Sequence, residues 1–155
     1  MLTSKEAWAS KYIGVPFLAG GRTLKGLDCY GLLHVVFKEQ LGVDIPEHQD
    51  VYYERNPSED GHDRQTVGDA ISMRTLKDWT PIIDGQEKSM DGIILRIAGH
   101  PIHIGLVLVP GIMLHSEFGH DTVVESYRNL KWERRLVGFY RHKSLIGGTV
   151  AAGNP

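Results

Sequence analysis

Five short segments rich in β-branched and aromatic residues follow one another in the second half of the chain, and they limit the fold more than any other feature. They are residues 93–97, 102–109, 112–116, 122–127 and 137–140. Turn-forming glycine, proline, asparagine or aspartate residues separate them. Segments of this length and composition are typical of antiparallel strands. The region after Met90 therefore predicts an antiparallel sheet.

Helical patterns come first in the chain, before these strands. Residues 3–6 (TSKE) resemble a capping box and predict a short helix of about two turns that ends before Gly14. After a glycine-rich loop, apolar residues recur at helical spacing from Cys29 to Leu41, and Gly42 supplies a stop signal. Helices followed by strands are typical of an α+β domain. We expect N-terminal helices that pack on a C-terminal antiparallel sheet.

The length of 155 residues suits a single domain. We expect this domain to cover residues 1–145. Residues 47–90 are polar and aromatic without a clear period and predict a variable insert, although residues 67–76 have a helical pattern. The small and polar residues 146–155 predict a flexible tail.

The composition argues against several classes of protein. Charged residues make up 23% of the chain and the formal net charge is −2, so the overall charge does not favour nucleic acid or an acidic membrane surface. No stretch approaches the roughly 20 apolar residues that cross a bilayer, and the start MLTSKEAW lacks the basic-then-apolar order of a signal peptide. We expect a soluble protein with no nucleic-acid partner and no membrane insertion.

Cys29 is the only cysteine, so it cannot form an intrachain disulfide. A lone cysteine is commonly a buried, inert thiol. Its position argues otherwise, because Asp28 can cap the predicted helix and place Cys29 at the first helical residue. The unpaired amides and the positive end of the helix dipole favour a thiolate there. We therefore expect Cys29 to be a nucleophile.

A thiol that attacks an amide needs a base, and the base needs a group that holds its tautomer. His103 and His115 lie 12 residues apart on two predicted strands that form a hairpin around Pro110 and Gly111. They are our candidates for the base and its partner, provided that they share one face of the sheet.

The register of this hairpin decides whether the two histidines can meet. A two-residue turn would pair Val109 with Ile112 and put the histidines on opposite faces of the sheet. A three-residue loop would pair Leu108 with Ile112 and place Gly105 opposite His115, with the two imidazoles at a diagonal separation of about 7–8 Å. We therefore expect the three-residue loop.

Three motifs follow one another along the chain: DCYG at residues 28–31, HIG at residues 103–105, and a further histidine at His115. In this order and spacing they resemble the NlpC family of papain-like cell-wall cysteine peptidases. The resemblance covers about residues 8–46 and 90–127. It implies a papain-like fold in which Cys29 is the nucleophile, His103 the base and His115 its partner. Because this chemistry uses a thiolate and an imidazolium alone, we expect no metal or other cofactor.

The same resemblance implies a substrate and some of the residues that bind it. The substrate would be the peptide stem of peptidoglycan, cut after D-glutamate and before a diamino acid. Asp28 matches a family aspartate that receives a substrate amine, although it could equally be a plain helix cap. Phe17 stands where many members have a tyrosine whose hydroxyl helps to hold the oxyanion. The backbone amides of Cys29 and Tyr30 would then carry more of that task.

Tyr30, directly after the cysteine, and the ending RNLKWERRLVGFYRH most resemble the phage tail branch of the family, whose arrangement also occurs in gene transfer particles. This implies a tail-tip or tail-assembly component that opens the cell wall during DNA delivery, with other tail-tip proteins as partners. The protein would be made in the bacterial cytoplasm, carried on the virion tail and active in the periplasm or cell wall.

Three alternatives remain open at the level of sequence. His100, His103 and His115 could bind zinc instead, since three histidines on adjacent strands can face one site. The protein could also be a structural tail component that keeps the fold without activity, for which Phe17 is the main argument. An acyltransferase or amidase on the same scaffold would share the Cys-His pair and differ only in its substrate.

Overall fold

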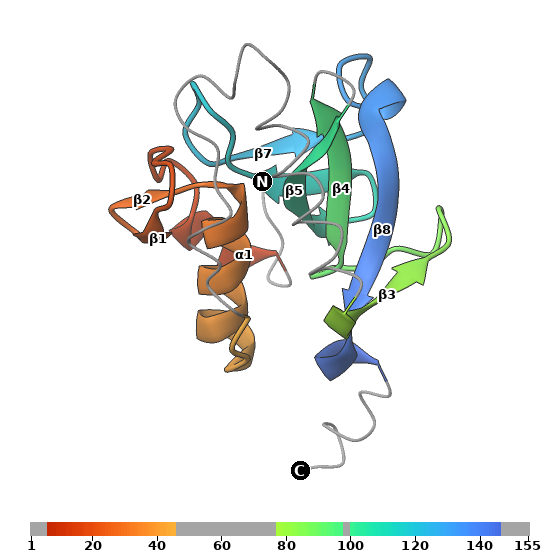
Figure 1. Cartoon of the computed structure of the whole chain (residues 1–155), viewed down its shortest axis with the longest axis horizontal. Helices are drawn as coiled ribbons and strands as arrows, with labels where there is room; N and C mark the ends of the chain where they lie inside the picture. Colours follow the sequence, from red (N-terminus) through yellow and green to blue (C-terminus); the bar gives the residue numbers. More distant parts are fainter. Residues whose placement is uncertain (1–5, 46–76, 98–99, 147–155) are drawn as a thin grey trace.

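The computed structural model describes residues 6–45, 77–97 and 100–146, and within these ranges the chain forms a helical layer beside a large antiparallel sheet (Figure 1). The α+β class expected from the sequence is confirmed. The predicted helix at 67–76, most of the predicted insert and the tail beyond Ile146 lie outside the described residues. Within the described ranges no helix is long and apolar enough to cross a bilayer.

Six strands form the sheet, in the spatial order β3-β8-β4-β5-β6-β7, and all neighbours are antiparallel. Their bounds are β3 Trp79–Ile82, β4 Gly92–Ile97, β5 His100–Val109, β6 Ile112–His115, β7 Val123–Ser126 and β8 Leu136–His142. The five predicted segments correspond to β4 to β8. No strand was predicted at β3, which contains Pro81. Proline is tolerated there because β3 lies at the edge of the sheet.

The predicted helix after the glycine-rich loop is α1, Cys29–Val36, continued by the π-helical turn η2, Phe37–Leu41. It ends at Gly42, whose φ of 66° lies in the left-handed region that glycine adopts at low cost. The shorter N-terminal helix is a 3-10 helix, η1, Ala7–Lys11, rather than an α-helix.

A small two-stranded sheet made of β1, Arg22–Thr23, and β2, Gly26–Leu27, leads into α1. In Figure 1 it lies beside the first turn of that helix. A Cβ atom on Gly31 would fall 1.9 Å from the carbonyl oxygen of Gly21. The glycine two residues after the cysteine is therefore required for the loop to pack against the helix.

The sheet carries apolar side chains on both faces. The face covered by α1 holds a cluster that includes Leu32, Leu33, Val36, Ile94, Ile104, Leu106 and Leu114. The opposite face holds a second cluster formed by Ile93, Leu95, Val107, Met113, Tyr127, Trp132 and Phe139. Because side chains alternate along a strand, neighbouring residues of β4, β5 and β6 enter different clusters.

Candidate active site

Cys29 is the first residue of α1, as predicted, and it is only 4% exposed. The Asp28 side chain caps the helix by accepting a hydrogen bond of 2.7 Å from the Gly31 amide. The Cys29 thiol lies against the backbone amides of Tyr30 and Ile104, both of which lower its pKa. Since Ile104 directly follows His103 on β5, the helix N-terminus brings the thiol to the segment that carries the predicted base.

The expected thiolate is not the favoured form of Cys29 in this structure. Burial and, to a smaller extent, the negative charge of Asp28 raise the pKa of the thiol to about 12, although the two amides and Arg22 act in the opposite direction. A helix N-terminus stabilises a thiolate by fractions of a kcal/mol up to about 2 kcal/mol, which does not offset full burial beside a carboxylate. The sequence showed the helix terminus but not this burial. At neutral pH the group is a thiol.

His103 and His115 contact each other directly. The Nε2 atom of His103 lies 2.9 Å from the Nδ1 atom of His115, with ring centroids 5.1 Å apart. Both imidazoles are buried, at 0% and 1% exposure. Trp132 stacks on the His103 ring with an interplanar angle of 18°. The indole fixes the plane of that ring and helps to exclude water from it.

The turn of the β5–β6 hairpin that brings the two histidines together differs from the predicted one. Val109 does pair with Ile112, so the connection is the two-residue turn and the predicted three-residue loop is wrong. A bulge at Leu108 then shifts the register, and the ladder resumes at Val107 and Met113. An extra residue on one strand reverses the faces of everything beyond it.

This shift places Gly105 opposite His115. The same pairing was predicted from the sequence, but with a three-residue loop in place of the bulge. A Cβ atom on Gly105 would lie 3.1 Å from the His115 Cβ. Gly111 has a φ of 97°, which suits the third position of a Pro-Gly type II turn. Pro110 and Gly111 therefore fit the observed turn better than the predicted loop.

Both histidines are neutral at pH 7. Burial lowers the pKa of His103 well below its ordinary value, and the nearby His115 and Lys131 act in the same direction. Burial also lowers the pKa of His115, although the hydrogen bond that this imidazole donates to Glu125 raises it. The Nδ1 atom of His103 is buried and makes no hydrogen bond with the described residues. It is a free ring nitrogen in the segment that the thiol approaches.

A third polar group continues the pair. The Glu125 carboxylate lies on β7, and its Oε1 atom is 2.8 Å from the His115 Nε2 atom. Glu125 was not among the site residues predicted from the sequence. The signal that could have found it is strand periodicity, because Val123 pairs with His115 and Glu125 is two residues further along the same face. That inference needs the register between β6 and β7, which the polar loop between them does not fix.

Asp28 is occupied by structural bonds. It is 2% exposed, and its carboxylate accepts hydrogen bonds from Arg22 and from the amides of Gly31 and Gly20, at 2.7–2.8 Å. The capping role left open by the sequence is thus present, and both oxygens already have partners. Binding of a substrate amine remains a prediction.

Phe17 is half-buried and packs edge-to-face on Phe118, with ring centroids 5.9 Å apart. Its backbone bridges to Leu27, two residues before the cysteine. The two rings line a pocket of about 210 Å³ together with Pro16, Gly119, His120 and Asp121. Tyr30, by contrast, is buried at 3% exposure, and its backbone amide lies beside the thiol.

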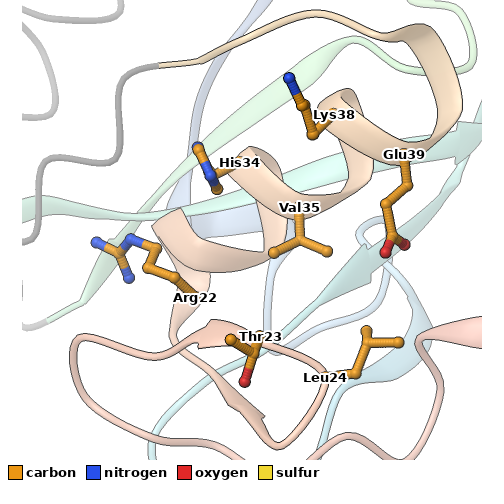
Figure 2. Close-up of a pocket in the computed structure, with 7 residues that line it drawn as sticks. All are labelled: Arg22, Thr23, Leu24, His34, Val35, Lys38 and Glu39. Carbon is orange, nitrogen blue, oxygen red and sulfur yellow. The ribbon is translucent and has the colours of Figure 1, made fainter.

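A larger pocket of about 270 Å³ lies on the outer side of α1 (Figure 2). Its walls come from β1, the β1–β2 turn and the helix, and its lining residues are Arg22, Thr23, Leu24, His34, Val35, Lys38 and Glu39. The charged groups there are largely paired, Lys38 with Asp44 and Glu39 with Lys11. Cys29, His103 and His115 do not line this pocket, so pocket volume alone does not identify the reactive site.

The zinc alternative depends on a side chain outside the described part of the structure, since that of His100 is not described. Among the side chains that are described, no three metal-binding groups converge on one point. The nitrogens of His103 and His115 that face each other form a hydrogen bond instead.

Comparison with known proteins places this geometry in context. The sequence pattern of the NlpC/P60 family matches residues 14–141. Murein DD-endopeptidase MepS/Murein LD-carboxypeptidase of Escherichia coli K12 is 22% identical over 122 residues, which are 79% of this chain and 53% of the relative. Gamma-DL-glutamyl hydrolase of Bacillus subtilis 168 is 51% identical over 148 residues, which are 95% of this chain and 30% of the relative.

A solved structure has the same fold. The crystal structure of a protein similar to lipoprotein of the NLP/P60 family, from Staphylococcus aureus Mu50, superposes with a TM-score of 0.62 at 18% identity. The match covers 89% of this chain and 40% of that one. The chain therefore spans about half or less of the length of each of these three proteins.

Proposed function

This chain belongs to the NlpC/P60 family, and we propose that it is a cysteine peptidase that cleaves the peptide stems of bacterial peptidoglycan. Two observations carry the proposal: Cys29 lies at a helix N-terminus against the Ile104 amide, and His103, the residue before Ile104, forms a hydrogen-bonded pair with His115. A thiol, a neutral imidazole with a free nitrogen and a second group that orients this imidazole are what acyl transfer by cysteine requires.

The resting protonation states favour a general-base mechanism. Because the thiol and His103 are both neutral at pH 7, the proton moves from the Cys29 sulfur to the His103 Nδ1 atom as the sulfur attacks the substrate carbonyl. The imidazolium then protonates the leaving amine, and an acyl-enzyme remains on the sulfur. Water attacks this acyl group with His103 again acting as the base. The product acid leaves and the neutral pair is restored.

The developing oxyanion would be held by backbone amides. Those of Tyr30 and Ile104 already lie at the sulfur, and the Phe17 ring has no donor to add. Phe17 and Phe118 instead offer an apolar wall beside the residues that lead into the cysteine.

For the bond cleaved, we propose the D-glutamyl bond that precedes the diamino acid of the stem. The name of one relative, a murein endopeptidase, supports a wall-peptide substrate, and the name of the other, a gamma-DL-glutamyl hydrolase, supports cleavage at a glutamyl residue. The sequence resemblance described above points to the same bond.

The proposal extends to a place on a phage tail tip or a tail-like particle, where the enzyme would open the wall during DNA delivery and contact other tail-tip proteins. Its support is the likeness of Tyr30 and of residues 128–142 to the phage tail branch. Trp132, which stacks on His103, belongs to that second segment, so the segment contributes to the site itself.

A second candidate function is a structural tail component without activity. The raised pKa of Cys29 and the absence of a hydroxyl at Phe17 favour it. An acyltransferase or amidase would use the same residues on another acceptor.

Mass analysis of peptidoglycan fragments separates these functions. Purified protein should release fragments that end in D-glutamate, and Cys29→Ala should release none. Intact wall after treatment with the wild type favours the structural role, and transfer of an acyl group to an added amine, with no hydrolysed fragment, favours the transferase.

A further inference from the structure

Glu125 lies at the end of a chain of hydrogen bonds that begins at the catalytic pair. The His103 Nε2 atom is 2.9 Å from the His115 Nδ1 atom, and the His115 Nε2 atom is 2.8 Å from Glu125 Oε1. The three side chains come from the adjacent strands β5, β6 and β7. The exposed fraction of the side chain rises from 1% at His115 to 29% at Glu125, so the chain leads from the buried pair toward solvent.

Glu125 determines which ring nitrogen of each histidine carries a proton. An ionised carboxylate only accepts hydrogen bonds, so the His115 Nε2 atom must carry a proton. A neutral imidazole has one N–H, which leaves the His115 Nδ1 atom as an acceptor. The His103 Nε2 atom must then donate to it, and the His103 Nδ1 atom keeps a bare lone pair.

The bare Nδ1 atom is the one that the chemistry needs. It makes no hydrogen bond with the described residues, and it belongs to the residue next to Ile104, whose amide contacts the thiol. In the opposite order of protons His103 would carry its proton on Nδ1 and could not accept one from Cys29. Without a carboxylate, the two orders would differ little in energy.

We propose that Glu125 is a positioning residue that fixes the tautomer of His115 and, through it, that of His103, so that the His103 Nδ1 atom is the proton acceptor. This role rests on the proposed function, although the tautomers themselves can be observed without turnover.

The surroundings of Glu125 keep it ionised. Burial raises the pKa of this carboxyl, but the hydrogen bond from His115, the nearby Trp132 indole and the charge of Lys131 bring the pKa below its usual value. The indole N–H makes no hydrogen bond of ordinary geometry with the described residues, so its effect is that of a nearby dipole. Asn129 adds a weak hydrogen bond of 3.4 Å to the second oxygen.

An ordinary ion pair is a different explanation of the same contact. It would require a charged His115, whereas burial lowers the pKa of that imidazole. The neighbouring Glu117 and Lys131 form a separate ion pair of 2.8 Å in the pocket that Glu125 also lines. Glu117 is therefore a matched control: a carboxylate of the same pocket that makes no hydrogen bond to either ring.

Nitrogen-15 spectra of the labelled imidazoles at pH 8 test the proposal directly. In the wild type, His103 and His115 should both be protonated on Nε2 and bare on Nδ1. Glu125→Ala should give a mixture of tautomers at both residues, while Glu117→Gln should match the wild type. A proton on the His103 Nδ1 atom in the wild type, or unchanged tautomers in Glu125→Ala, would overturn it.

Kinetics give the second readout. Glu125→Ala should lower kcat roughly ten- to a hundredfold at unchanged KM, as removal of an outer partner of a functional histidine does elsewhere. Glu125→Gln should retain more activity, because its amide oxygen can still accept from His115. Equal kcat in Glu125→Ala and the wild type contradicts the positioning role. If the wild type cleaves nothing, the proposed function fails, and the spectra still decide the tautomer order.

Discussion

The Nε2 atom of His103 and the Nδ1 atom of His115 are 2.9 Å apart because one residue, Leu108, bulges out of the strand between them. Without the bulge the two-residue turn would put the rings on opposite faces of the sheet. The histidine pair is thus a product of hairpin geometry as well as of residue type.

The first prediction concerns His115. His115→Ala should lower kcat on the order of 10²- to 10⁴-fold, because the base loses the group that orients it. His115→Asn should retain more activity, since its carbonyl oxygen can still accept a hydrogen bond from His103. His115 is 1% exposed, so the alanine variant should also lose about 1–3 kcal/mol of unfolding free energy, measured by denaturant titration.

His120 provides the control for this series. It is exposed, and its Nε2 atom lies 3.9 Å from a carboxylate oxygen of Glu117. His120→Ala should leave both turnover and stability unchanged. Equal damage in His120→Ala and His115→Ala would remove the assignment of His115.

Gly105 allows a test of the close approach between the strands. An added Cβ would meet the His115 Cβ at 3.1 Å and the Leu114 carbonyl oxygen at 3.2 Å. Gly105→Ala should therefore displace His115, lower kcat, and cost about 1–3 kcal/mol of stability. Gly138→Ala in β8 is the matched control, because its nearest neighbours are 3.7 Å away. If both variants behave alike, contact with His115 does not set the cost.

Phe17 is the third site. Phe17→Tyr adds a hydroxyl next to a pocket of about 210 Å³, where there is room for it. We expect unchanged or higher kcat, because a well-aimed donor to the oxyanion can contribute on the order of 3 kcal/mol. A lower kcat with an unchanged melting temperature would show that the phenyl ring itself is needed for binding.

The fourth prediction concerns stability in acid. Burial lowers the pKa of His103, His115 and His142, so each binds a proton more readily in the unfolded chain than in the folded one. Their stabilising effect is fully present above the unfolded pKa of about 6.5 and is lost as the pH falls from there toward the folded values. Unfolding free energy should drop by up to about 1.4 kcal/mol per pH unit for each histidine.

Denaturant titrations between pH 8 and pH 5 measure this slope. His142→Leu should make it shallower, and His120→Leu should not. If the wild type, His142→Leu and His120→Leu have the same slope, groups other than His142 cause the loss of stability in acid.

Helices and strands that are marked by local sequence signals were predicted correctly. The DCYG motif, the helical spacing after Cys29 and the strand-like segments predicted the helix, its cap and most of the sheet, and the structure has them. Gly105 and His115 were also placed opposite each other. The bulge at Leu108 was missed because no residue type marks a bulge when the flanking residues are all apolar.

Burial and the register between strands far apart in the sequence could not be predicted either. The pKa of Cys29 depends on the sheet packed against it and on Asp28, and a sequence shows only the second of these. Glu125 reaches His115 through the register of β6 and β7, and β3 was hidden by Pro81. Each depends on contacts between segments far apart in the chain.

The pH dependence of kcat/KM on a stem peptide with acylated amines tests the central claim most directly, because it reports the ionisations of the free enzyme. With a neutral thiol and a neutral His103 at rest, kcat/KM should rise with pH through an apparent pKa below 6.5 and then stay level to pH 10. Cys29→Ala should show no turnover at any pH. A bell-shaped profile that falls between pH 8 and pH 9 would instead reveal a thiolate–imidazolium pair and contradict the neutral resting site.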